Sequence, residues 1–171
     1  MIDISNLAIH IPGFIAMFCI IASIQMKTKE KYLYFQIIGA FSFGAYFLLL
    51  NGYTGVLTNL LLCIQALIAL YFLKKNTDIP KWVMITLFSI TVLFGFFIID
   101  RWLDLLPLLV AVTTLIIYFQ SKEKMIRYLS LILAIWIPYA IYYNAWFSLI
   151  TSVFFLVSTL IAIYRYDLRK T

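Results

Sequence analysis

The chain has 171 residues, of which 65% are hydrophobic and only 12% are charged, and its formal net charge is +6. A soluble domain carries about 25% charged residues. The chain therefore has too little polar surface to cover a water-soluble globule, and its composition predicts an all-α integral membrane protein. Two cysteines, Cys19 and Cys63, lie in apolar runs, which is typical of small buried residues rather than of a disulfide or a metal site.

Seven apolar stretches approach the roughly 20 residues that a helix needs to cross the hydrocarbon core of a bilayer. No basic segment precedes the first stretch and no small-residue cleavage site follows it, so we expect a first span rather than a signal peptide. Short loops separate the stretches. Asn51-Gly52-Tyr53-Thr54 has turn chemistry because Asn and Gly tolerate positive φ, and Asn144-Ala145-Trp146 is its counterpart. The expected spans are Leu7–Met26, Tyr32–Leu50, Gly55–Leu73, Trp82–Ile99, Leu103–Phe119, Ile126–Tyr143 and Phe147–Tyr164.

Twelve of the 13 Lys and Arg residues fall on one side of these seven spans, and Arg101 is the exception. Cytoplasmic loops of membrane proteins carry an excess of Lys and Arg, so the N-terminus is expected outside and the C-terminus in the cytoplasm. The positive charge is then a topology signal, and no nucleic-acid partner is expected. The twelve are Lys27, Lys29, Lys31, Lys74, Lys75, Lys81, Lys122, Lys124, Arg127, Arg165, Arg169 and Lys170.

A shift of 93 positions aligns Lys29–Tyr71 with Lys122–Tyr164, and ten of the 43 aligned positions are identical. The identities include a charged triplet, Asn51 with Asn144, and two tyrosine pairs, which an apolar composition would not readily align by chance. The repeat predicts two parallel three-helix bundles, residues 1–73 and 103–171 with a cytoplasmic tail, joined by a loop and linker helix at 74–102. Because each bundle has three spans, the single linker helix restores the orientation of the second.

This layout resembles that of the SWEET and PnuC transporters, in which one linker helix joins two parallel triple-helix bundles. Asp104-Leu105-Leu106-Pro107, the basic fifth loop and the Gly52-Tyr53 turn resemble the YgjV-type bacterial inner-membrane family over most of the chain. The resemblance implies a multi-pass protein of the bacterial cytoplasmic (inner) membrane. SWEET-type proteins pair a proline in the first and second helix of each bundle; Pro107 and Pro138 fit this pattern, but Phe14 and Ala45 occupy the equivalent positions of the first copy.

Polar residues at membrane depth are the candidates for a solute site. Gln65, near the centre of the third span, and its repeat partner Ser158 are expected to face each other across a central cavity. The SWEET resemblance implies a similar site, with amide side chains from the third helix of each bundle. Asn59 is expected on nearly the same face as Gln65 and pairs with Ser152. Hydrogen bonding between helices is the alternative role for these residues.

Aromatic residues near the same level are further candidates. Trp136 could stack on a ring-shaped solute or pack between helices, and Tyr46 and Tyr139, one turn outward, could form an outer gate or belong to an aromatic belt. Thr113 is a candidate to line the path or simply to pack.

No enzyme signature is present: the single histidine, His10, lies at the outer end of the first span, and no carboxylate cluster or nucleophile set accompanies it. We expect no enzyme, no metal and no cofactor. No acidic residue lies deep in a span, which favours facilitated passage of a small neutral polar solute, such as a sugar or vitamin, over ion-coupled pumping. A non-transporting receptor or accessory subunit with a SWEET-like fold is the alternative. Membrane lipid and the solute are the expected partners, and a homo-oligomer remains an open alternative.

Overall fold

The computed structural model describes residues 4–24, 26, 28–98, 101–119 and 123–169, and nearly all of these residues are helical. The all-α prediction is confirmed. Within the described residues, Lys29–Leu49, Tyr53–Lys74 and Trp102–Phe119 are long and apolar enough to cross a membrane, and four other apolar helical stretches are shorter. Seven membrane crossings therefore stay a prediction.

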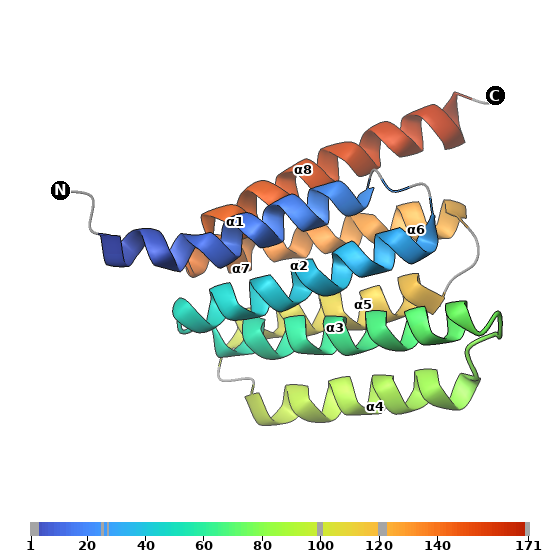
Figure 1. The fold of residues 1–171 in the computed structure, drawn as a ribbon, viewed down its shortest axis with the longest axis horizontal. Coiled ribbons are helices and arrows are strands. Elements are labelled where there is room, and N and C mark those ends of the chain that lie inside the picture. The colour runs from blue at the N-terminus through green and yellow to red at the C-terminus, as the bar shows by residue number, and fades with distance from the viewer. Residues whose placement is uncertain (1–3, 25, 27, 99–100, 120–122, 170–171) are drawn as a thin grey trace.

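The helices follow the seven expected spans in order (Figure 1). Two of those spans contain a short 3₁₀ segment, at the start of the fifth and within the sixth, and a π-helical turn follows the last. The elements are α1 (Ile4–Ile24), α2 (Lys29–Leu49), α3 (Tyr53–Lys74), α4 (Lys81–Ile98), η1 (Trp102–Asp104), α5 (Leu105–Phe119), α6 (Glu123–Ser130), η2 (Leu131–Ile135), α7 (Trp136–Tyr142), α8 (Trp146–Ile163) and η3 (Tyr164–Leu168).

Six of these spans form a closed ring. α1 packs on α2, α2 on α3 and α3 on α5; the broken helix α6–η2–α7 packs between α5 and α8, and α8 returns to α1. In the 93-residue register, α8 corresponds to α3 and α1 corresponds to α5. The α8–α1 contact is therefore the repeat equivalent of the α3–α5 contact, and the two halves of the ring contact each other in the same way at both places. α4 lies outside the ring against α5 and α3, at the lower edge of Figure 1.

The ring has two chemically different ends. One end holds the start of α2, the α3–α4 connection, the start of α6 and the C-terminal end of α8, all on the right in Figure 1. We call it the basic end, because every Lys and Arg of the described segments except Arg101 belongs to elements or loops at this end. The opposite end, the turn end, holds the α2–α3 and α7–α8 turns. Lys27, Lys122 and Lys170 lie outside the described residues.

The two turns at the turn end have the same backbone structure. Asn51 and Asn144 have φ of 57° and 51°, which confirms the expected turn chemistry. The next residue bonds back in the same way in both copies, with the N–H of Gly52 donating to the Phe47 carbonyl and that of Ala145 to the Ala140 carbonyl, each at 2.8 Å. Each bond satisfies a carbonyl in the last turn of α2 or α7. The following helices, α3 and α8, both start two residues after the asparagine.

The sixth span departs from the single helix that was expected, because Leu131–Ile135 is 3₁₀-helical. Pro138 explains the break: proline has no N–H to donate, and its ring crowds the carbonyl four residues earlier, at Ala134. Ala45 occupies the equivalent position in α2, which runs without interruption from Lys29 to Leu49. The second half of the ring therefore contains a weak point that the first half lacks.

Candidate functional site

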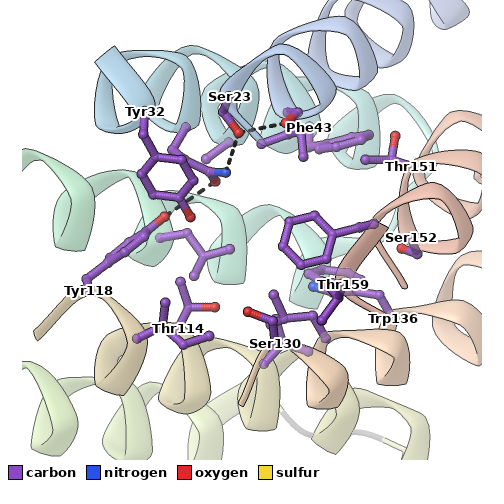
Figure 2. A pocket seen from close by; sticks show the side chains of 18 of the residues that line it. Ser23, Tyr32, Phe43, Thr114, Tyr118, Ser130, Trp136, Thr151, Ser152 and Thr159 are labelled. Atoms are coloured by element: carbon purple, nitrogen blue, oxygen red, sulfur yellow. Dashed lines mark hydrogen bonds between the residues drawn. The ribbon is translucent and has the colours of Figure 1, made fainter. Parts of the chain in front are cut away.

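The ring encloses a cavity of about 690 Å³, which receives side chains from all six of its segments. Thr28 and Lys29 line the cavity and are exposed, so it opens at the basic end. Figure 2 looks into it, with Tyr32 and Tyr118 on one side and Trp136 on the other. Small-molecule sites typically measure about 300–1,000 Å³. The cavity is therefore large enough for a solute the size of a small metabolite.

An aromatic plug, consisting of Phe43, Tyr46, Phe47, Trp136 and Tyr139, closes the cavity toward the turn end. The rings of Phe47 and Trp136 stack with centroids 5.5 Å apart and planes at 20°, and both residues also line the cavity. Tyr139 packs against both, with centroids 5.5 Å from Phe47 and 5.4 Å from Trp136. Tyr46 and Tyr139, the two expected gate residues, are both 0% exposed.

Tyr139 also ties the two halves of the ring together. Its hydroxyl accepts a hydrogen bond of 2.8 Å from the N–H of Gly55, in the first turn of α3. Free N–H groups at a helix start need such partners, so the bond both caps α3 and holds it against α7. The hydroxyl of Tyr46 lies at the equivalent place, beside the amides of Trp146 and Phe147, but makes no hydrogen bond of normal geometry to a described residue.

Glycine at position 55 allows this close packing. A Cβ atom there would lie 2.8 Å from Cγ of Phe47, well inside normal contact distance. At Gly44 a Cβ atom would meet its nearest neighbour, Cβ of Asn59, at an ordinary 3.7 Å. The plug thus rests directly on the α3 backbone at Gly55.

Near the open end, a polar network joins α1, α2 and α5 across the two halves. The amide of Gln36 donates to the Ser23 hydroxyl at 2.9 Å and accepts from the Tyr118 hydroxyl at 3.5 Å, as the dashed lines in Figure 2 show. Lys29 donates to the carbonyl of Tyr118 at 3.3 Å. Gln36 was not among the residues predicted from the sequence, although an amide in an apolar helix is itself a signal that it faces protein or a cavity.

The hydroxyls of the cavity wall fall into two groups. Thr151 and Ser152 donate to carbonyls one turn earlier in α8, at 2.7 and 2.9 Å. Thr114, Ser158 and Thr159 also line the cavity, and none of the three has a hydrogen-bond partner among the described residues. The second group is available to a solute or to water.

Four of the six residues expected to bind solute do line the cavity, namely Asn59, Trp136, Ser152 and Ser158. Asn59 donates its amide hydrogen to the carbonyl of Gly55 at 2.8 Å. Its amide oxygen has no donor among the described residues, and it remains an acceptor on the cavity wall.

The other two, Gln65 and Thr113, do not line the cavity. Gln65 is 0% exposed between α3 and α5, where its amide donates to the Ala111 carbonyl at 3.4 Å and its oxygen has no partner among the described residues. Thr113 donates to the carbonyl one turn earlier in α5. Gln65 therefore does not face Ser158 across the cavity. Six residues of α-helix turn a side chain by about 240°, so Asn59 and Gln65 cannot share a face as expected.

A second pocket, of about 320 Å³, lies at the turn end. Asn51, Tyr53 and Thr54 line it from the first half of the ring, Asp104, Tyr142 and Tyr143 from the second, and Arg101 from the residue just before η1. Asp104 is only 4% exposed, although it lies near the end of a span. The chain folds the carboxylate back onto the start of η1–α5, where it accepts from the backbone N–H of Arg101 at 3.1 Å.

Residues 7–170 match the model of a protein family described as Imp-YgjV, bacterial inner membrane protein. The chain belongs to the Imp-YgjV family. No curated protein and no solved structure matches the chain. Membership of Imp-YgjV confirms the family suggested by the short motifs, and makes the protein a bacterial inner membrane protein with apolar membrane helices.

Proposed function

We propose that this Imp-YgjV protein is a facilitative transporter of a small polar solute without net charge, working by alternating access. The observation that carries the proposal is a cavity inside a six-helix ring that opens at one end and stops at a single aromatic plug. Alternating access requires a site near mid-membrane that one barrier separates from each side in turn. The cavity supplies such a site in a state open toward the basic end.

One side chain, Tyr139, lies between the cavity and the second pocket. Its ring contacts Phe47 and Trp136, which line the cavity, and also Tyr143, which lines the pocket, with centroids 4.8 Å apart. Its hydroxyl bonds the amide of Gly55, next to Thr54 in the pocket wall. Cavity and pocket thus form two ends of one path, and separating α3 from α7 at this bond would join them.

The lining supports an uncharged polar solute with a flat or ring-shaped part. Free hydroxyls and the Asn59 amide supply donors and acceptors, and Phe43, Phe47, Trp136 and Phe155 supply aromatic surface. No Asp or Glu is among the lining residues that the structure describes, so these residues offer no carboxylate for proton or sodium coupling. A sugar-like or vitamin-like solute fits this description, and the proposal assigns no catalytic reaction or cofactor to the chain.

The proposal includes seven membrane crossings, with the basic end in the cytoplasm and the N-terminus outside, because all described Lys and Arg residues except Arg101 gather at one end. It also includes a SWEET-like arrangement of two parallel bundles with α4 as the linker. The equivalent α3–α5 and α8–α1 contacts support the parallel repeat.

A receptor or accessory subunit is the second candidate, because a cavity open at one end also suits a protein that binds without conducting. Flux separates the two. The purified chain is reconstituted into liposomes and assayed for uptake and counterflow of a panel of radiolabelled sugars and vitamins. Saturable uptake that Trp136→Ala abolishes, while the variant stays folded, supports transport. Equilibrium binding of a panel solute without flux assigns the receptor role, and neither binding nor flux across the panel contradicts the proposed solute class.

A further inference from the structure

The pocket at the turn end brings together two opposite charges that do not pair with each other. Arg101 and Asp104 both line it, yet the described residues contain no Arg101–Asp104 ion pair. The Asp104 carboxylate accepts from the Arg101 backbone, whereas the Arg101 guanidinium donates to the Tyr142 hydroxyl and lies over the Tyr142 ring, 5.6 Å from its centroid. Each charge is therefore held apart from the other by a different element.

Burial makes this separation energetically significant. Asp104 is 4% exposed and has no Lys or Arg side chain within ion-pair distance among the described residues. A buried carboxylate without a cationic partner is costly, and a positively charged group in the pocket would offset that cost. Arg101 is exposed, and a guanidinium fork binds a carboxylate through two parallel hydrogen bonds.

Aromatic rings complete the pocket. Tyr53, Tyr142 and Tyr143 line it. The rings of Tyr142 and Tyr143 pack edge to face, with their centroids 5.1 Å apart. Tyrosine faces attract ammonium groups and pack against apolar or aromatic side chains. The volume of about 320 Å³ is enough for a molecule the size of an amino acid.

We infer that this pocket binds a small zwitterion, with an ammonium group at Asp104 and a carboxylate at Arg101. The inference narrows the solute class of the proposed function, and its place on the transport path rests on that function. Binding to the pocket needs no transport, so the two can fail independently. A free zwitterion has no net charge, which agrees with the uncharged solute that the large cavity favours.

Binding is measured by calorimetry on the full chain in detergent, with three matched probes: phenylalanine, phenethylamine, which lacks the carboxylate, and 3-phenylpropionate, which lacks the ammonium. We expect saturable binding of phenylalanine and binding at least about tenfold weaker for each single-charge probe, because each leaves one charge of the pocket without its partner. Asp104→Asn keeps an acceptor for the Arg101 N–H, and Arg101→Gln keeps a polar side chain. Each variant is expected to weaken phenylalanine binding by about tenfold or more.

Lys75→Gln and Asp78→Asn are the matched controls, since both residues are exposed at the basic end and should leave binding unchanged. Phenethylamine binding as tightly as phenylalanine, with no effect of Arg101→Gln, would reassign the pocket to simple cations. Tight binding of 3-phenylpropionate alone would reassign it to anions. No saturable binding of any probe by the folded protein overturns the inference, and the liposome flux assay then decides the proposed function separately.

Discussion

The two halves of the ring have the same order of helices and turns, but their middle helices differ in regularity. Both end their middle helix with an asparagine at positive φ, and both place a buried tyrosine in the last turn of that helix. In the first half, α2 is one continuous helix; in the second, η2 (Leu131–Ile135) interrupts the equivalent helix shortly before Pro138. Of these two tyrosines, Tyr139 alone makes a hydrogen bond of normal geometry to the opposite half within the described part of the chain.

This difference indicates a rigid half and a movable half. A mid-helix 3₁₀ segment lacks part of the regular hydrogen-bond ladder, so the α6–η2–α7 helix can bend there at low cost. Before the break, α6 is held against η3 by a bidentate salt bridge between Arg127 and Asp167. Nη2 and Nε of Arg127 lie 2.8 and 3.0 Å from the two carboxylate oxygens of Asp167. We therefore expect α7, with Trp136 and Tyr139, to move as the plug opens while α2 stays fixed.

The largest expected effect comes from exchanging the proline between halves. Ala45→Pro should destabilise the protein by about 3 kcal/mol or more, because a proline inside α2 removes a hydrogen bond and clashes with the preceding turn. Pro138→Ala, the reciprocal change, should leave stability unchanged or raise it while slowing solute flux. Thermal unfolding in detergent and liposome flux measure the two quantities. Equal destabilisation by both substitutions would show that the halves do not differ in rigidity.

A second substitution tests the close contact beneath the plug. Gly55→Ala places a methyl group 2.8 Å from Cγ of Phe47 and should cost about 1–3 kcal/mol of unfolding free energy. Gly44→Ala is the matched control, since its nearest contact is 3.7 Å and alanine favours a helix. Chemical denaturation of both variants gives the difference. Equal stabilities would mean that Phe47 yields easily and that the plug does not rest on α3.

The tyrosine pair gives a smaller but sharper test. Tyr139→Phe removes the acceptor of the Gly55 N–H, and we expect a loss of about 1–2 kcal/mol because a buried donor is left unpaired. Tyr46→Phe removes a hydroxyl without a normal hydrogen bond and should be close to neutral. Unfolding free energies measured side by side check the asymmetry. Similar losses in both variants would indicate that Tyr46 is bonded as firmly as Tyr139.

The smallest expected effect is at Gln65. Gln65→Leu should leave stability unchanged or raise it by up to about 1 kcal/mol, because the amide oxygen is buried without a partner among the described residues. Solute flux per folded molecule should stay at the parent level. A loss of flux with stability intact would return Gln65 to the solute path, despite its place between α3 and α5.

Much of the fold could be predicted because its signals are local. Asn51 and Asn144 indicated turns since few other residues adopt positive φ at low cost, and the apolar stretches located the helices within a few residues. The 93-residue repeat also anticipated that the two turns would match.

The site could be predicted only in part, because it depends on helix rotation and on neighbours distant in sequence. Their similar depth in the membrane suggested that Asn59 and Gln65 belong to one site. Their different positions around the axis of α3 direct Asn59 to the cavity and Gln65 to α5. Gln36 meets Tyr118 only because α2 and α5 are adjacent in the ring. The burial of Asp104 could not be predicted, because it depends on a 3₁₀ turn that hydropathy does not reveal.

The aromatic plug, through Tyr139, is expected to separate the cavity from the turn end, and cysteine labelling from each side of the membrane measures this separation. Ser152→Cys, on the cavity wall, is placed in a background with Cys19→Ala and Cys63→Ala, and oriented liposomes receive a membrane-impermeant maleimide from one side at a time. We expect fast labelling from the basic end with or without Tyr139→Ala. From the turn end we expect slow labelling that Tyr139→Ala accelerates about tenfold or more. Labelling from the turn end that Tyr139→Ala leaves unchanged would contradict the claim.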